Sequence, residues 1–163
     1  YYFMTTKLSQ EEREQRKKLF GTFAEGLRPN KPYNWQLDDS LLLEIPVTTM
    51  PLVKVPIHAS YVLYLANFSK HLALAYFRTA LLMCRLTGVK PSLLLHPLDF
   101  MNGDDVPELG FFPAMRQKLD DKLAIMDRIL TLMTNQYTAV TMYEFAQQVQ
   151  QGNPMRMVEP HFR

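Results

Sequence analysis

The chain has 163 residues, 47% of them hydrophobic and 21% charged, the composition of one ordinary globular domain that can bury a core of its own. Its 12% aromatic content excludes a disordered chain, and its single cysteine, Cys84, excludes an intramolecular disulfide framework or a Cys-rich zinc module. The formal net charge of +2 is too small to create the field of a nucleic-acid-binding protein, so no nucleic-acid partner is expected.

The first predicted elements are a helix, a loop and a strand. Ser9 is followed three residues later by Glu12, the spacing of a capping box, so a helix is expected from there to Gly26. Residues 28–40 are polar and rich in turn-forming residues, which predicts a loop. The short apolar run 41–48 predicts a strand buried on both faces. Three prolines then make residues 46–57 an extended loop.

The longest apolar stretch runs from Ser60 to Thr87. Lys70, Arg78 and Arg85 interrupt it, and each central charge costs roughly 2.5–3.5 kcal/mol in a membrane span, so an amphipathic helix ending at Gly88 is predicted instead. His71 shares one helix face with Arg78 and Arg85, because the three recur every seven residues. A neighbouring, mainly apolar face consists of Leu72, Tyr76, Thr79, Met83 and Leu86. A solvated basic face is favoured, and contact with lipid or another protein stays open.

The second half repeats the alternation of strand and helix. Residues 91–97 predict a second buried strand, followed by a long acidic loop over 97–114, a length more often functional than accidental. Spacing of four and three between apolar residues predicts a helix over 119–133. The remaining predicted elements are a short strand 137–140, a last helix capped by Thr141 with Glu144 three residues on, and a frayed tail from Gly152. Strands alternating with helices predict an α/β architecture with parallel pairing.

Few residues offer chemistry. The four histidines (His58, His71, His96 and His161) include no pair at helical metal-binding spacing, and the glycines form no phosphate-binding loop. There is no G-x-S-x-G nucleophile motif. Cys84 lies inside the long predicted helix and is interpreted as a small core residue rather than a nucleophile.

His96 stands apart from the other histidines. It follows three leucines and precedes Pro97, at the carboxyl end of a predicted strand, where catalytic side chains of parallel α/β folds collect. A histidine there suits general acid or base work, and Asp99 can orient it or pair with its charge. The alternative is a histidine hydrogen-bonded into a strand–loop junction, and position alone does not decide between the two.

Two weaker candidates for substrate binding are His58 and Phe111. His58 lies just beyond the other predicted strand, so it faces the same edge as His96 if the two strands are neighbours. Phe111, with Phe112, either forms a sugar-stacking platform or pins down the long loop, and pinning is favoured.

The segment Leu93-Leu94-Leu95-His96-Pro97-Leu98-Asp99 resembles the last signature motif of the polysaccharide deacetylase family, the NodB-homology or chitin-deacetylase-like proteins. In that motif a Leu-rich strand ends in a catalytic histidine. Residues 42–47 resemble an earlier strand of these proteins, and residues 137–144 resemble their closing strand and the start of the following helix. The similarity spans roughly residues 41–148, with the order of the motifs preserved.

This resemblance implies an α/β fold that is the C-terminal part of a distorted (β/α) barrel. It implies a hydrolase that removes N-acetyl or formyl groups from amino sugars of a polysaccharide or a lipid-linked glycan. His96 takes the role of general acid on the departing amine, and Asp99 that of its supporting partner. A divalent metal, zinc in the first instance, is implied for the complete protein, where it polarises the carbonyl and activates water.

The departures from the family pattern are equally specific. Its early Asp-Asp motif and its His-x-x-x-His metal motif have no counterpart, since Asp38-Asp39 and Trp35 stand in other contexts. The chain also begins at Tyr1 without Met or a secretory signal pattern. Residues 1–151 are therefore expected to be the C-terminal portion of such a domain and 152–163 a tail, with the metal ligands absent. The chain alone is expected to be inactive and poorly stable, because a partial barrel leaves sheet edges unpaired.

Two further readings stay open. In the first reading, the chain is a catalytically silent deacetylase-like module or an independent α/β binding module, and His96 has a structural role. Alternatively, the basic stripe makes it a membrane-peripheral interaction module. Proximity to a membrane suits a lipid-linked substrate, while the compartment and the oligomeric state are left open.

Overall fold

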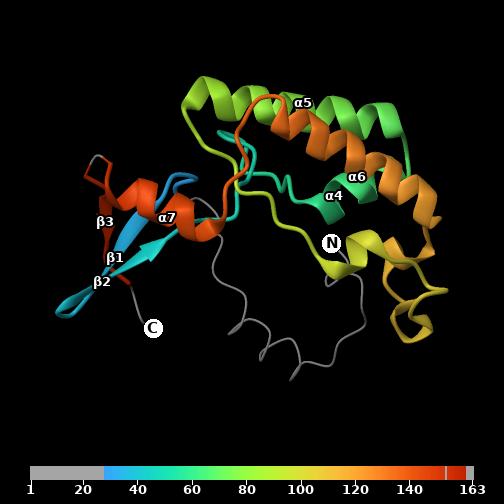
Figure 1. The fold of residues 1–163 in the computed structure, drawn as a ribbon, viewed down its shortest axis with the longest axis horizontal. Coiled ribbons are helices and arrows are strands. Elements are labelled where there is room, and N and C mark those ends of the chain that lie inside the picture. The colour runs from blue at the N-terminus through green and yellow to red at the C-terminus, as the bar shows by residue number, and fades with distance from the viewer. Residues whose placement is uncertain (1–27, 153, 161–163) are drawn as a thin grey trace.

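The structure is a computed structural model that describes residues 28–152 and 154–160. The helix predicted to start at Ser9 lies outside the described residues. The described chain is mixed α/β: in Figure 1 three helices gather at one end, and a small sheet with a fourth helix lies at the other. The two ends are joined by extended segments. A barrel of the deacetylase type is neither shown nor excluded by this arrangement.

The sheet has three strands in the order β2-β1-β3. β1 (Tyr33–Leu37) and β2 (Ser40–Glu44) form an antiparallel hairpin, while β3 (Arg156–Val158) pairs with β1 in parallel. The prediction of a loop over 28–40 is therefore wrong at β1, where Tyr33 is buried. The turn-forming residues on both sides obscured a short strand that starts with strand-favouring aromatic residues.

Three further strand predictions need correction. The strand within 41–48 exists as β2, but it is an edge strand with Leu41 and Leu42 more than half exposed, and it is not buried on both faces. Parallel pairing holds for β1 with β3 and is wrong for β1 with β2. The tail from Gly152 is not wholly frayed, because residues 156–158 find a partner in β1.

The segments 91–97 and 137–140 were predicted as strands and are not. Residues 91–96 form no strand: the carbonyls of Ser92 and Leu94 accept only isolated hydrogen bonds, from Thr48 N and Ala59 N, and Pro97 already begins a 3-10 helix. Leu94 and Leu95 are exposed, so the predicted burial is also wrong. An apolar run rich in leucine fixes neither pairing nor burial by itself.

The predicted helix over 60–87 is two helices, α4 (Ala59–Ala66) and α5 (Lys70–Thr87). The break is set by Ser69, whose extended backbone and side chain, accepting a hydrogen bond from Leu72 N, cap α5. Gly88 ends α5 in the left-handed conformation, with φ of 65°, so the predicted end is confirmed.

The mainly apolar face of Leu72, Tyr76, Thr79, Met83 and Leu86 is not the buried face of α5, because Leu72 and Leu86 are exposed. The buried face lies on the other side of the helix and consists of Ala73, Phe77, Ala80, Leu81 and Cys84. The basic residues His71, Arg78 and Arg85 are exposed, as expected of a solvated face. The helix contains apolar residues on two faces, and the sequence pattern alone did not show which one packs inward.

Between α5 and the last helices, the predicted loop 97–114 contains three short 3-10 helices. These are η1 (Pro97–Phe100), η2 (Pro107–Leu109) and η3 (Pro113–Arg116), each starting at a proline. The helices predicted after them are confirmed as α6 (Leu119–Thr134) and α7 (Met142–Gln150). Thr141 and Glu144 form the predicted capping box of α7.

The larger core cluster joins α4, α5 and α6 through Ala59, Val62, Leu63, Ala73, Phe77, Leu81, Ile125, Met126 and Ile129. A smaller cluster contains Cys84, which is fully buried. Burial raises the pKa of the Cys84 thiol to about 11, so its interpretation as a core residue is confirmed. Within residues 28–152 and 154–160, no helix has both the length and the hydropathy needed to cross a membrane.

Candidate functional site

The candidate site lies where the start of α4 meets the segment that leads into η1. We call His58, Ser60, His96 and Asp99 the His96 cluster. His96 has extended backbone and immediately precedes η1, as its N-cap. Its side chain is 45% exposed, whereas the Asp99 side chain is completely buried. The cluster therefore presents a titratable ring to solvent and keeps a carboxylate behind it.

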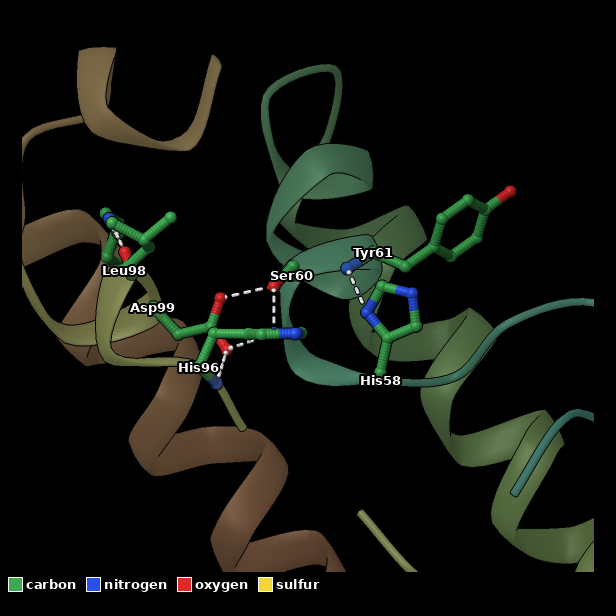
Figure 2. A network of polar contacts seen from close by, with 7 residues as sticks. His58, Ser60, Tyr61, His96, Leu98 and Asp99 are labelled. Atoms are coloured by element: carbon green, nitrogen blue, oxygen red, sulfur yellow. Dashed lines mark hydrogen bonds and ion pairs between the residues drawn. The ribbon is translucent and has the colours of Figure 1, made fainter. Parts of the chain in front are cut away.

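Ser60 connects the two predicted residues (Figure 2). Its hydroxyl donates to Asp99 Oδ1 over 2.6 Å and lies 3.0 Å from His96 Nδ1. Because the single hydroxyl hydrogen is directed at Asp99, the Ser60 oxygen accepts from His96 Nδ1–H. This assigns the Nδ1–H tautomer to neutral His96 and leaves Nε2 as the nitrogen for exchanging a proton with a bound molecule.

Asp99 is held by two hydrogen bonds. Besides the Ser60 hydroxyl, it accepts from the His96 backbone N–H over 2.8 Å, through Oδ2. The same Oδ2 lies 3.7 Å from His96 Nδ1, too far for a hydrogen bond but close enough to stabilise a positive imidazolium. Asp99 is thus a fully buried carboxyl group beside the His96 ring, with both of its oxygens engaged in hydrogen bonds.

His58 is the second histidine of the cluster. Its Nδ1 accepts from Tyr61 N over 3.3 Å and caps α4, so neutral His58 carries its hydrogen on Nε2. The rings of His58 and His96 are 6.1 Å apart, centre to centre. Burial lowers the pKa of His58, the neighbouring His96 lowers it further, and Asp99 acts in the opposite direction. Burial and the neighbouring His96 therefore both favour the neutral form of His58.

The expectation that His58 and His96 face the same edge is met in position but not for the predicted reason. Neither residue follows a strand. The two are brought together because Ala59 N, at the start of α4, donates to the carbonyl of Leu94 over 3.2 Å. A single main-chain hydrogen bond thus brings the two histidines together, where the sequence predicted neighbouring parallel strands.

Lys122 of α6 holds the backbone next to the His96 cluster, and the sequence did not predict this role. It is 1% exposed, and its Nζ donates to the carbonyls of Leu98 (2.6 Å), Ala114 (3.0 Å) and Met101. Burial lowers the Lys122 pKa, while Asp99 and Asp105 oppose that effect. The lysine thereby fixes the backbone of η1, which carries Asp99. Its signal in the sequence was a charged residue on the apolar stripe of the predicted helix 119–133.

Ser60 was also missed. The only signal for it was proximity to His58 in the sequence, because its contact with Asp99 depends on how α4 meets η1. Phe111 is half exposed, and its ring lies 4.2 Å from that of Phe112. Among the described residues, the ring contacts of Phe111 do not include His58 or His96. The structure therefore does not join Phe111 to the His96 cluster.

The described residues do not fit the divalent metal that the resemblance implied. Among them there is no group of three or more His, Cys, Asp or Glu side chains able to hold a metal ion. Within the cluster, both oxygens of Asp99 and Nδ1 of His58 are already engaged in hydrogen bonds. Among the described residues, the cluster therefore supplies fewer ligands than a protein metal site normally needs.

The presence of Ser, His and Asp does not make a serine nucleophile. In a catalytic triad the histidine accepts the serine proton at one nitrogen and donates to the carboxylate from the other. Here Ser60 donates to Asp99 and accepts from His96, and the same Nδ1 faces both partners. The arrangement instead suits a histidine that exchanges protons through Nε2.

No protein-family model matches this sequence, and neither a curated protein nor a solved structure matches it.

Proposed function

We propose that the His96 cluster supplies the proton donor of an N-deacetylase acting on amino sugars of a polysaccharide or a glycolipid. The observation that carries the proposal is the Ser60 hydroxyl between buried Asp99 and the Nδ1 of a half-exposed His96. The similarity of residues 93–99 to the last motif of the polysaccharide deacetylases supplies the substrate class. That similarity, with residues 42–47 and 137–144 in the family order, also supports a domain of the distorted (β/α) barrel type.

The proposed step is protonation of the departing amine. An amide nitrogen leaves poorly as an anion, so hydrolysis needs an acid whose pKa lies near neutrality. After water has added to the acetyl carbonyl, protonated His96 donates from Nε2 to the sugar nitrogen as the C–N bond of the tetrahedral adduct breaks, which releases acetic acid and the free amine. Its Nδ1–H bond to Ser60 orients the ring, and the Asp99 carboxylate stabilises the imidazolium. The proposal concerns this step alone, because the described residues hold no metal site.

A second candidate function is a binding module in which His96 is structural. The observation that favours it is the capping box of η1: Asp99 accepts from the His96 backbone N–H, so a local turn alone explains part of the network. A structural role makes no use of Nε2 of the half-exposed His96 ring. The two functions therefore differ in what loss of the ring does to turnover.

The test compares His96→Gln, Ser60→Ala and Ser60→Thr in the full-length protein that carries this sequence, supplied with divalent metal. Release of free amine from N-acetylglucosamine oligomers is measured across pH. His96→Gln is expected to lower kcat by about 10²-fold or more. Ser60→Ala is expected to lower kcat less and to shift the pH profile of kcat. Ser60→Thr keeps the hydroxyl and is expected to keep the wild-type pH profile.

His71→Gln, an exposed histidine on α5, is the matched control and is expected to leave the rate unchanged. Wild-type turnover by His96→Gln contradicts the proposal. So does a wild-type protein without turnover in which His96→Gln lowers the unfolding midpoint, a result that favours the binding module. Histidine ¹⁵N NMR gives an independent check, since Ser60→Ala should remove the Nδ1–H preference of neutral His96.

A further inference from the structure

The side of α5 that faces away from the core is apolar. Within α5, residues at spacings of three and four from Leu72 to Leu86 form an exposed stripe, and the exposed Phe68 lies just before the helix. The large members are Phe68, Leu72, Leu82 and Leu86, which are 70%, 56%, 52% and 76% exposed. Ala75 and Thr79 complete the stripe between them. We call these six residues the outer stripe.

The outer stripe lies nearly opposite the buried face of the helix. At about 100° per residue, the buried residues centre on Ala73, Ala80 and Cys84, and the outer stripe lies roughly 180° around from them. In Figure 1, α5 runs along one outer edge of the molecule. A solvated surface helix normally places polar residues there, so this face marks an interaction surface.

The charge along α5 is one-sided. Its sequence contains Lys70, His71, Arg78 and Arg85 and no acidic residue. Lys70 is paired with Asp121 of α6. His71, Arg78 and Arg85 are exposed and flank the outer stripe along one side, each one position before a stripe residue. An apolar face bordered by arginines is complementary to a surface that is negative outside and apolar inside.

We propose that the outer stripe of α5 lies on an anionic lipid surface, with its leucines and Phe68 in the interfacial zone and Arg78 and Arg85 among the headgroups. This inference goes beyond the proposed deacetylase activity and does not depend on it. Interfacial helices combine an apolar face with basic residues in this way, and arginine stems bury their methylenes while the guanidinium reaches phosphate.

A second copy of the chain fits this face less well. Two copies of α5 packed antiparallel along the outer stripe would place their arginine flanks against each other, and α5 has no carboxylate to pair with them. The heptad-like spacing nevertheless makes self-association the outcome that the test must separate from lipid binding.

The experiment measures co-sedimentation of the full chain with vesicles of phosphatidylcholine alone or with about 30% phosphatidylglycerol, at low and high salt. Binding is expected only to the anionic vesicles and is expected to fall steeply at high salt. Arg78→Gln/Arg85→Gln is expected to weaken the partition coefficient about tenfold or more, since each arginine near an anionic surface contributes on the order of 1 kcal/mol. Leu82→Gln/Leu86→Gln should weaken binding comparably.

Matched controls change the same chemistry elsewhere. Arg116→Gln/Arg128→Gln removes two exposed arginines, and Leu123→Gln/Val140→Gln removes two exposed apolar side chains; both should bind like the wild type. Circular dichroism confirms that each variant is folded. Equal binding to neutral vesicles, equal loss in the controls, or no vesicle binding overturns the proposal. A dimer in solution that Leu82→Gln/Leu86→Gln dissociates, without lipid binding, assigns the face to a second copy instead.

Discussion

Ser60 has one hydroxyl hydrogen, and its direction determines the state of its neighbour. With that hydrogen on Asp99, the oxygen is left to accept from His96 Nδ1, and the exposed edge of the ring acquires a defined role. The buried Asp99 carboxylate thereby influences which nitrogen of the half-exposed His96 ring carries the hydrogen. At the residue scale, the tautomer of His96 thus depends on Ser60, a residue that no sequence motif pointed to.

His58 makes stability depend on pH. Its pKa is lowered from the ordinary value of 6.5 in the folded protein, so the unfolded chain binds more protons below that value. The contribution of His58 to the free energy of unfolding is therefore complete above pH 6.5, and it is lost as the pH falls from 6.5 through the pKa of His58 in the folded protein. His58→Asn keeps an N-cap acceptor for α4 and removes the titration. The variant is expected to lose less stability than the wild type on acidification.

The measurement is the urea midpoint of both proteins at pH values on either side of 6.5. His71→Asn, on the exposed face of α5, serves as the control and should retain the wild-type pH dependence. An acid-induced loss that is identical in His58→Asn and the wild type would show that His58 is not the group responsible.

At the scale of elements, Lys122 of α6 fixes the backbone of the segment that contains η1, η2 and η3. Its ammonium group holds carbonyls on both sides of η2, from Leu98 and Met101 near η1 and from Ala114 in η3. Backbone carbonyls in a segment without a sheet or long helix need such partners when buried. The position of Asp99, and with it the His96 cluster, depends on a residue of α6.

Replacing Lys122 by Met keeps the length and the apolar stem and removes the donors. Three part-buried carbonyls then lose a charged partner, and the expected loss is about 2–4 kcal/mol of unfolding free energy. Urea denaturation measures the loss. Lys118→Met, an exposed lysine just before α6, is the control and should change stability by less than about 0.5 kcal/mol. Similar stability of the two variants would contradict the support role of Lys122.

The elements that the sequence predicted best are those stabilised by local rules. The apolar spacing of α6, the capping box at Thr141 and the left-handed end at Gly88 need no information about distant residues. The strands depend on partners, and there the predictions failed: residues 91–97 have the composition of a buried strand but no strand to pair with. His96 and Asp99 were found because they lie close in sequence, whereas Ser60 and Lys122 reach them only through tertiary contacts.

At the scale of the whole molecule, two differently organised parts share one chain. The helices α4, α5 and α6 enclose the larger core, and the sheet β2-β1-β3 lies apart from them with α7 alongside (Figure 1). α7 buries no residue completely and owes its start to the capping box. The His96 cluster belongs to the helical part, so the candidate site does not require the sheet for its contacts.

Ending the chain after Gly152 tests this division. The truncated protein lacks β3, which forms three residue pairs with β1, and such pairs contribute about 0.2–1 kcal/mol each. Amide hydrogen exchange is expected to accelerate in β1 while α4, α5 and α6 keep their protection. A chain ending after Pro160 retains β3 and is the control. Equal loss of protection in the helices and in β1 would show that the two parts unfold as one.

The pairing of Tyr33 with Arg156 has a consequence for the order of folding. The hairpin of β1 and β2 closes over a two-residue turn, so it forms among near neighbours within microseconds. The third strand must instead find β1 across nearly the whole described chain, and the entropy of closing so long a loop opposes the encounter until the intervening helices have shortened it. The sheet is thus begun early by local contacts and completed late, once the helical core has formed.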